Sequence, residues 1–163
     1  MLEHTVIWLK ALSKLGHMDE AVYHLSEALG LDPNNEKVHI YMGIALARLN
    51  KMDEAVVHLT RAIDLCPYCP DAHNSLGGVL TLKGDLEGAL KHLNQAIKLQ
   101  PDNAQAYNNM GLVFTQLGKL EEAIFFTAAA IHFKPDYTKA RANLQRIISQ
   151  LCRDSEEATI TNQ

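Results

Sequence analysis

The sequence lacks the features that mark several large classes of protein. No apolar stretch approaches the roughly 20 residues that cross a bilayer, so we expect no membrane span. The start, MLEHTVIWLK, has no basic segment and no small-residue cleavage site, so we expect no signal peptide. Lysine and arginine number 15 against 19 aspartates and glutamates, and the net charge of -4 argues against a nucleic-acid partner.

Cysteine is scarce and gives no disulfide framework. The chain has three cysteines, an odd number, and this favours a reducing compartment such as the cytoplasm. Cys66 and Cys69 form a CPYC motif, which can be a redox pair or half of a zinc site. Because no second CxxC accompanies the motif, we interpret it as part of a surface loop. No serine-histidine-acid, paired-carboxylate or phosphate-loop pattern is present, so we expect neither an enzyme nor a cofactor.

The chain does contain a repeat of 34 residues. Prolines recur at this interval, and so do two sets of alanines, at Pro33, Pro67, Pro101 and Pro135, at Ala21, Ala55, Ala89 and Ala123, and at Ala28, Ala62, Ala96 and Ala130. Apolar residues make up 47% of the 163 residues, which is enough for one domain with a core. Repetition in three columns predicts a repeat architecture.

Each repeat is predicted to be two helices joined by a tight turn. Turn residues with access to the left-handed conformation stand at Gly16, Asn50, Gly84 and Gly118. Small residues at Gly43, Gly77 and Gly111 allow the two helices to approach closely. We place the repeats at about 2–35, 36–69, 70–103 and 104–137, a capping helix at 138–152, and a disordered tail at 153–163. The charged residues of the capping helix, Lys139, Arg141 and Arg146, are expected to keep the exposed end of the stack soluble. Since one helix pair cannot bury both of its faces, the copies must stack into an all-α solenoid.

This pattern resembles the tetratricopeptide repeat over Leu2 to Tyr137. Its elements are a small residue in the first helix, two alanines seven residues apart in the second, and a closing proline. Two departures, Leu9 in place of glycine and Thr127 in place of leucine, are interpreted as local packing changes. The resemblance implies a right-handed superhelix whose concave face, lined by the first helices, binds a peptide or a segment of another protein.

We map the concave face to one side of each first helix. Its lining is expected at Val6, Lys10, Ser13 and Lys14; at Lys37, Ile40, Tyr41, Ile44 and Arg48; at Asp71, Asn74, Ser75 and Thr81; and at Gln105, Asn108, Asn109, Leu112 and Gln116. The residues expected to hold the ligand are Lys10, Lys14, Lys37, Ile40, Tyr41, Ile44, Arg48, Asn74, Asn108 and Asn109. The N-terminal half of the concave face is basic and has the aromatic ring of Tyr41 at its floor, which suits an acidic, extended segment. The alternative is a solvated face with ordinary lysines.

Two subfamilies were compared with these columns. Chaperone-binding repeats hold the C-terminal carboxylate of their ligand with a clamp of lysine, asparagine and arginine side chains. This clamp is absent here, because Val6, Tyr41 and Ser75 occupy positions where the clamp residues would stand. An asparagine ladder, as in the repeat arm of O-linked N-acetylglucosamine transferase, is present in part at Asn109 and Asn143. We therefore expect a non-catalytic adaptor or scaffold, and the alternative is a regulatory or substrate-docking arm of a larger enzyme such as a glycosyltransferase.

Two further features complete the expectations. The columns His24, His58 and His92, and His39 and His73, cannot converge on one metal, because successive repeats stand about 10 Å apart. The helix from Leu2 to Leu15 is apolar nearly all round. A terminal helix needs a polar outer face, so we expect further repeats or a second copy of the chain to cover it.

Overall fold

The computed structural model describes residues 18–161, with side chains as far as residue 155. The predicted first helix, with Lys10 and Lys14, lies outside the described residues. All regular secondary structure from 18 to 161 is helical, in α2 (Met18–Leu31), α3 (Glu36–Arg48), α4 (Met52–Leu65), α5 (Pro70–Lys83), α6 (Leu86–Leu99), α7 (Ala104–Gln116), α8 (Leu120–Phe133) and α9 (Thr138–Thr161).

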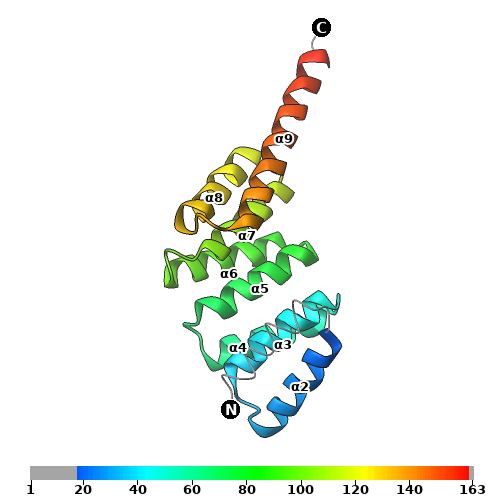
Figure 1. Ribbon diagram of the computed structural model, residues 1–163, viewed down its shortest axis with the longest axis vertical. Coiled ribbons are helices and arrows are strands. Elements are labelled where there is room, and N and C mark those ends of the chain that lie inside the picture. Colours follow the sequence, from blue (N-terminus) through cyan, green and yellow to red (C-terminus); the bar gives the residue numbers. More distant parts are fainter. Residues whose placement is uncertain (1–17, 162–163) are drawn as a thin grey trace.

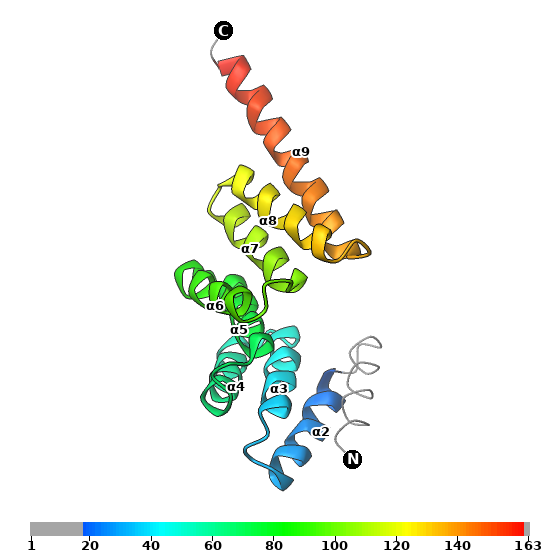
Figure 2. The same ribbon diagram turned by 90° about the vertical axis from the view of Figure 1, so that its left-hand side faces the viewer.

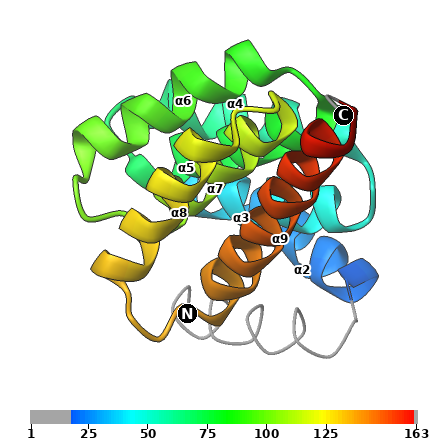
Figure 3. The same ribbon diagram turned by 90° about the horizontal axis from the view of Figure 1, so that it is seen from above.

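The helices form a stack of antiparallel pairs, so the predicted all-α solenoid is confirmed (Figure 1). The pairs are α3 with α4, α5 with α6 and α7 with α8, and each second helix also packs against the first helix of the next pair. The first helices contact one another as well, α3 with α5, α5 with α7 and α7 with α9. Seen along the stack, α4 and α6 lie on one side, whereas α2 and α9 lie on the other (Figure 3).

The turns within the pairs use the residues that the sequence predicted. Asn50, Gly84 and Gly118 have φ values of 62°, 83° and 71°, in the left-handed region. Glycine adopts this region without steric cost, and asparagine is the side-chain-bearing residue that tolerates it best. Two of the loops between pairs end in side-chain caps, since Asn35 and Asn103 accept hydrogen bonds from the amides of Val38 and Ala106 at the starts of α3 and α7.

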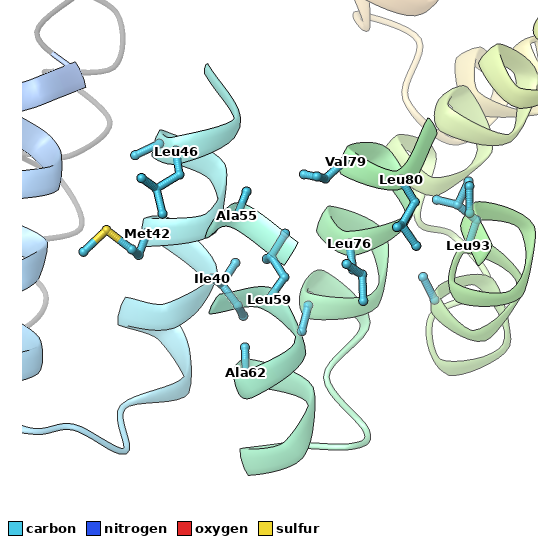
Figure 4. Close-up of a cluster of buried hydrophobic side chains, with 14 of the residues drawn as sticks. Ile40, Met42, Leu46, Ala55, Leu59, Ala62, Leu76, Val79, Leu80 and Leu93 are labelled. Carbon is cyan, nitrogen blue, oxygen red and sulfur yellow. The ribbon is translucent and has the colours of Figure 1, made fainter. Parts of the chain in front are cut away.

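The core forms where a glycine of a first helix meets a leucine of the second. A Cβ atom added to Gly43 would lie 2.5 Å from Cγ of Leu59, and one added to Gly77 would lie 2.6 Å from Cγ of Leu93. Both leucines are fully buried. The alanines of the second helices lie beside them, and side chains such as Leu76 fill the space between pairs (Figure 4). The glycines therefore set the close helix contact on which the repeat depends.

Thr127 changes this contact in the α7–α8 pair. It takes the place of the leucine and faces Gly111, whose added Cβ would lie 2.2 Å from the threonine Oγ1. The side chain is fully buried, and its hydroxyl has no hydrogen-bond partner among the described residues. Aromatic rings pack nearby, with Phe114 and Phe126 stacked at 5.0 Å between centroids.

The end of the chain differs from the prediction. The capping helix was expected to end at Cys152 and to be followed by a disordered tail, but α9 continues to Thr161 and extends beyond the α7–α8 pair (Figure 1 and Figure 2). The prediction of disorder over 153–161 was therefore wrong. Residues 138–161 contain no proline and no glycine, so nothing in the backbone stops the helix once packing has begun it. That packing comes from Ile147, which is fully buried against α8 and lies beside Leu120.

Candidate functional site

The face formed by the first helices carries three hollows. The first, of about 400 Å³, is lined by Met18, Ala21, Tyr41, Ile44, Ala45, Arg48, Gln105, Asn109, Tyr137 and Lys139. The second, of about 310 Å³, is lined by Glu36, Lys37, Ile40, Tyr41, Ile44, Cys69, Asp71, Asn74, Ser75 and Gln105. The third, of about 530 Å³, is lined by Asn74, Ser75, Gly78, Thr81, Leu82, Asn109, Leu112, Gln116, Lys139, Asn143 and Arg146.

These hollows form one continuous track, which we call the groove. Tyr41, Ile44 and Gln105 line both the first and the second hollow. Asn109 and Lys139 line both the first and the third. Because neighbouring hollows share lining residues, they lie next to one another along this face.

Most of the residues predicted to hold a ligand lie in the groove. The structure brings together Lys37, Ile40, Tyr41, Ile44, Arg48, Asn74 and Asn109. Lys37 and Arg48 reach the surface, whereas Ile40 and Asn74 are buried and offer only a small part of their side chains. Their place on one face is what the repeat spacing predicted, and their role in binding remains a proposal.

Asn108 is the exception, and its predicted place in the groove is wrong. Its side chain is fully buried and lines none of the three hollows. The register explains this, because Ile40, Asn74 and Asn108 occupy the same position in successive repeats and all three are buried. This position faces the next first helix, where Oδ1 of Asn108 accepts a hydrogen bond of 2.8 Å from Asn143.

The asparagines of the groove bond to one another across successive first helices. Nδ2 of Asn109 donates to Oδ1 of Asn74 at 2.9 Å, and the Asn143–Asn108 bond repeats the same geometry one pair further on. Both bonds join residues 35 apart in sequence. Nδ2 of Asn74 also donates to Oε1 of Gln105 at 3.4 Å. The amides therefore hold neighbouring repeats together, whether or not a ligand is present.

The groove has more positive than negative side chains, although the chain is acidic. Its described lining includes the cations Lys37, Arg48, Lys139 and Arg146 and the acids Glu36 and Asp71, whereas the whole chain has a net charge of -4. Both acids lie in the second hollow. The pKa of Tyr41 is raised, first by burial of its phenol and then by the negative charge of Asp71, so the phenol is neutral and can donate a hydrogen bond.

Four lining residues come from the last helix and the segment before it, and of these the sequence analysis had considered only Asn143 as part of a binding face. Lys139 and Arg146 were interpreted as charges that keep a capping helix in solution, and Tyr137 was not considered. A signal was present, because Lys139 lies three repeat lengths after Lys37 and Arg146 lies three repeat lengths after Ile44. The α9 helix thus continues the row of first helices and contributes to the same face.

Nothing in the described part of the chain forms a metal site. Within residues 18–155, no three histidine, cysteine, aspartate or glutamate side chains come close enough to hold one ion. Cys66 and Cys69 are free and half-buried, and burial raises the pKa of the Cys69 thiol, which makes it a poor nucleophile. Between residues 18 and 161, no helix is both long enough and apolar enough to cross a membrane.

Comparison with known families identifies the repeat. A tetratricopeptide-repeat model matches residues 12–76, a TPR-repeat model matches 77–118, and a further tetratricopeptide-repeat model matches 104–137. Together these matches cover the chain from residue 12 to residue 137. The chain belongs to the tetratricopeptide repeat family. No curated protein sequence matches it.

Solved structures of tetratricopeptide proteins share the fold. The thermophilic protein TTC0263 from Thermus thermophilus is 20% identical with a TM-score of 0.84, over 93% of this chain and 83% of that one. MamA residues 41-end from Desulfovibrio magneticus RS-1 is 24% identical with a TM-score of 0.71, over 96% and 89%. The first repeat domain of Spaghetti (RPAP3), bound to the HSP90 peptide SRMEEVD, is 25% identical with a TM-score of 0.65, over 72% and 93%. The repeats and these neighbours support a protein-interaction module, a class that is typically non-catalytic.

Proposed function

We propose that the chain is an adaptor that binds an extended, acidic segment of a partner protein along the groove. The observation that carries this proposal is the contrast of charge, with four cations and two acids among the described lining residues of a chain whose net charge is -4. A positive track on a negative molecule attracts an acidic segment and steers it away from the rest of the surface.

The shape of the groove favours an extended ligand over a compact one. The groove follows the row of first helices from α3 to α9, where neighbouring hollows share lining residues. A segment in extended conformation covers about 3.3 Å per residue, so a short stretch of chain can reach several repeats in turn. Its side chains would alternate between the groove and solvent.

The groove offers each part of such a segment a partner. Tyr41 and Ile44, which line two hollows, provide an apolar floor for one large side chain. The amides of Gln105 and Asn109 can both donate to and accept from peptide bonds. Lys139 lies where the first and third hollows meet, so it can attract a carboxylate from either side.

The peptide-bound neighbour supports the class of ligand. The peptide SRMEEVD in the Spaghetti (RPAP3) structure contains two glutamates and an aspartate. This chain lacks the charged clamp expected of chaperone-binding repeats, so we propose the acidic and extended character of the ligand and not its identity.

The alternative, a substrate-docking arm of a larger enzyme, depended on the partial asparagine ladder. Asn109 and Asn143 donate hydrogen bonds to Asn74 and Asn108 of the preceding first helix. Contacts between repeats are thus enough to explain why asparagines stand in this column, although each amide keeps further hydrogen-bonding capacity, and no separate observation favours an enzyme arm.

The proposal is tested with two labelled peptides of equal length and apolar content, one with glutamate and aspartate and one with glutamine and asparagine at the same positions. Fluorescence anisotropy at two salt concentrations gives their dissociation constants. We expect the acidic peptide to bind more tightly and to weaken with salt, because the charges are exposed. Equal affinity for the two peptides would remove the electrostatic basis of the proposal.

A pair of charge-matched variants locates the binding site. Lys139→Glu/Arg146→Glu reverses two groove cations, whereas Lys91→Glu/Lys98→Glu makes the same change in charge on exposed residues of α6. Exposed charge pairs contribute about 0.2–1 kcal/mol each, and reversal replaces each attraction with a repulsion of similar size, so reversal of two cations should weaken binding at least about fourfold. The α6 variant should stay within about twofold of wild type, and an equal loss in both variants would mean that overall charge, not the groove, controls binding.

A further inference from the structure

Two pairs of histidines join the helices of the second and third repeat units. Nδ1 of His39 on α3 lies 3.0 Å from Nδ1 of His58 on α4, and Nδ1 of His73 on α5 lies 3.1 Å from Nδ1 of His92 on α6. In both pairs the residues are 19 apart in sequence, and the ring centroids are 5.2 Å and 5.3 Å apart. Histidines of a single column lie too far apart to touch one another. The column of His39 and His73, however, contacts the column of His58 and His92.

In each pair, the hydrogen bond made by Nε2 of the histidine on the first helix determines which ring nitrogens carry hydrogen. Nε2 of His39 lies 3.0 Å from the carbonyl oxygen of Pro33, and Nε2 of His73 lies 3.0 Å from that of Pro67. Since a carbonyl oxygen only accepts, Nε2 must carry the hydrogen. In the neutral ring Nδ1 is then an acceptor, so Nδ1 of the partner histidine donates to it.

This arrangement accepts one extra proton but not two. A proton on Nε2 of His58 leaves its Nδ1–H donating to His39, so the bond survives. A second proton would have to go to Nδ1 of His39, and two N–H groups with two positive charges would then face each other across 3.0 Å. His39 and His73 are buried, with 8% and 7% of their surface exposed, so solvent cannot screen that repulsion.

The neighbouring charges do not cancel this effect. The pKa of His58 is lowered by burial first and by the charge of His39, while Glu54 acts in the opposite direction. For His92, burial, His73 and Lys91 lower the pKa, and Asp85 opposes them. In both cases the balance favours the neutral ring.

The fourth repeat unit makes the same contact without histidines. Tyr107 and Phe126 occupy the register positions of the two histidines, again 19 residues apart, and their rings stack at 6.3 Å between centroids. Aromatic side chains therefore suffice for the packing at this position. The histidines add a response to acid that the packing itself does not require.

We propose that the two histidine pairs make the α3–α4 and α5–α6 units open selectively in mild acid. A second proton on a pair forces its two rings apart, and with them the two helices that carry the rings. Those helices carry groove residues such as Lys37 and Tyr41. The opening itself is independent of the ligand, whereas its consequence, release of the ligand, rests on the proposed function.

The direction of the pH effect follows from linkage. A histidine whose pKa is lower in the folded than in the unfolded chain binds fewer protons when folded. Its contribution to stability is complete above the unfolded value of 6.5 and is lost as the pH falls through the lower folded value. Each excluded proton raises the opening constant at most about tenfold per pH unit, so an opening that includes both pairs rises at most about a hundredfold per pH unit.

The test uses native-state hydrogen exchange between pH 7.5 and 5, corrected for intrinsic exchange rates. Wild type is compared with His39→Tyr/His58→Phe/His73→Tyr/His92→Phe, which copies the rings of the fourth unit, and with His132→Tyr, a control on α8 outside both pairs. We expect amides of α3 to α6 in wild type and in the control to lose at least about tenfold in protection, while the aromatic variant loses less than about threefold. Amides of α7 and α8 should change little in all three chains.

An equal loss of protection in wild type and in the aromatic variant would overturn the proposal, and so would a loss spread evenly over α7 and α8. If the aromatic variant does not fold, an NMR titration of the wild-type imidazoles decides. One ring of each pair must stay neutral at a pH where an ordinary imidazole is charged, and independent titration of all four paired rings near pH 6.5 would contradict the proposal. Peptide binding plays no part in either readout, so a failure here is distinct from a failure of the groove.

Discussion

Gly77 is the position at which the packing of the repeat can be tested most sharply. The Cβ of an alanine there would lie 2.6 Å from Cγ and 2.8 Å from Cδ2 of Leu93, and 3.3 Å from the carbonyl oxygen of Ala89. Leu93 has no exposed surface, so it has no open space into which it can rotate. Gly77→Ala must therefore push α5 and α6 apart.

The magnitude follows from two opposing effects. Alanine in place of glycine favours a helix by about 0.5–1 kcal/mol, whereas overpacking a filled core costs about 1–3 kcal/mol. Gly30→Ala serves as the control, because nothing lies within 4 Å of a Cβ added to Gly30 in α2. The two variants share the propensity effect, so their free energies of unfolding should differ by the steric cost of about 1–3 kcal/mol.

Chemical denaturation of both variants measures this difference. A second arm adds Leu93→Ala, which alone should cost about 2–5 kcal/mol because of the cavity it leaves. In the double variant the new methyl group of residue 77 enters part of that cavity, so the combined loss should be less than the sum by about 0.5–3 kcal/mol. If Gly77→Ala matched Gly30→Ala in stability, or if the double variant were strictly additive, the close helix contact would not be what holds the pair together.

Two further predictions concern single asparagines. Asn143→Ala removes the donor to the buried Oδ1 of Asn108 and should lower the free energy of unfolding by about 1–3 kcal/mol. Urea denaturation measures this loss, and a value below about 0.5 kcal/mol would mean that the hydrogen bond between repeats is dispensable. Asn50→Ala forces alanine into a turn with φ of 62° and should cost about 1 kcal/mol, whereas Asn50→Gly should not. Thermal unfolding of the two Asn50 variants compares them, and equal melting temperatures would argue against a strained turn.

The repeat architecture could be predicted from the sequence because its causes are local and recur. A glycine or asparagine is needed wherever the turn enters the left-handed region, as at Asn50 and Gly84. A glycine is also needed wherever a buried leucine of the second helix touches the first, as at Gly77. These requirements return with each copy, so a 34-residue spacing reveals them.

Features that depend on contacts between columns could not be predicted in this way. His39 and His58 stand in different columns, and only the pairing of the two helices shows that their rings meet. The burial of Asn108 likewise depends on Asn143 of the following helix. A comparison of residues 34 positions apart in the sequence reveals the repeat, but it does not reveal hydrogen bonds between residues of different columns.

The contribution of the last helix to the groove was missed for another reason. A terminal helix needs charged residues for solubility, and this explanation of Lys139 and Arg146 concealed their second property, which is their register with Lys37 and Ile44. Their place in the groove follows from the packing of α9 against α7 and α8. Charge on an end helix is thus informative only when its register in the repeat is considered as well.

The central claim is that the face of the first helices binds an extended acidic segment, and amide chemical-shift mapping tests it most directly. The isotope-labelled chain would be titrated with the acidic peptide and with its neutral counterpart. The account predicts that the acidic peptide shifts amides along α3, α5, α7 and the first half of α9, and leaves those of α4 and α6 nearly unchanged. Shifts confined to the second helices, or the same shifts with the neutral peptide, would contradict it.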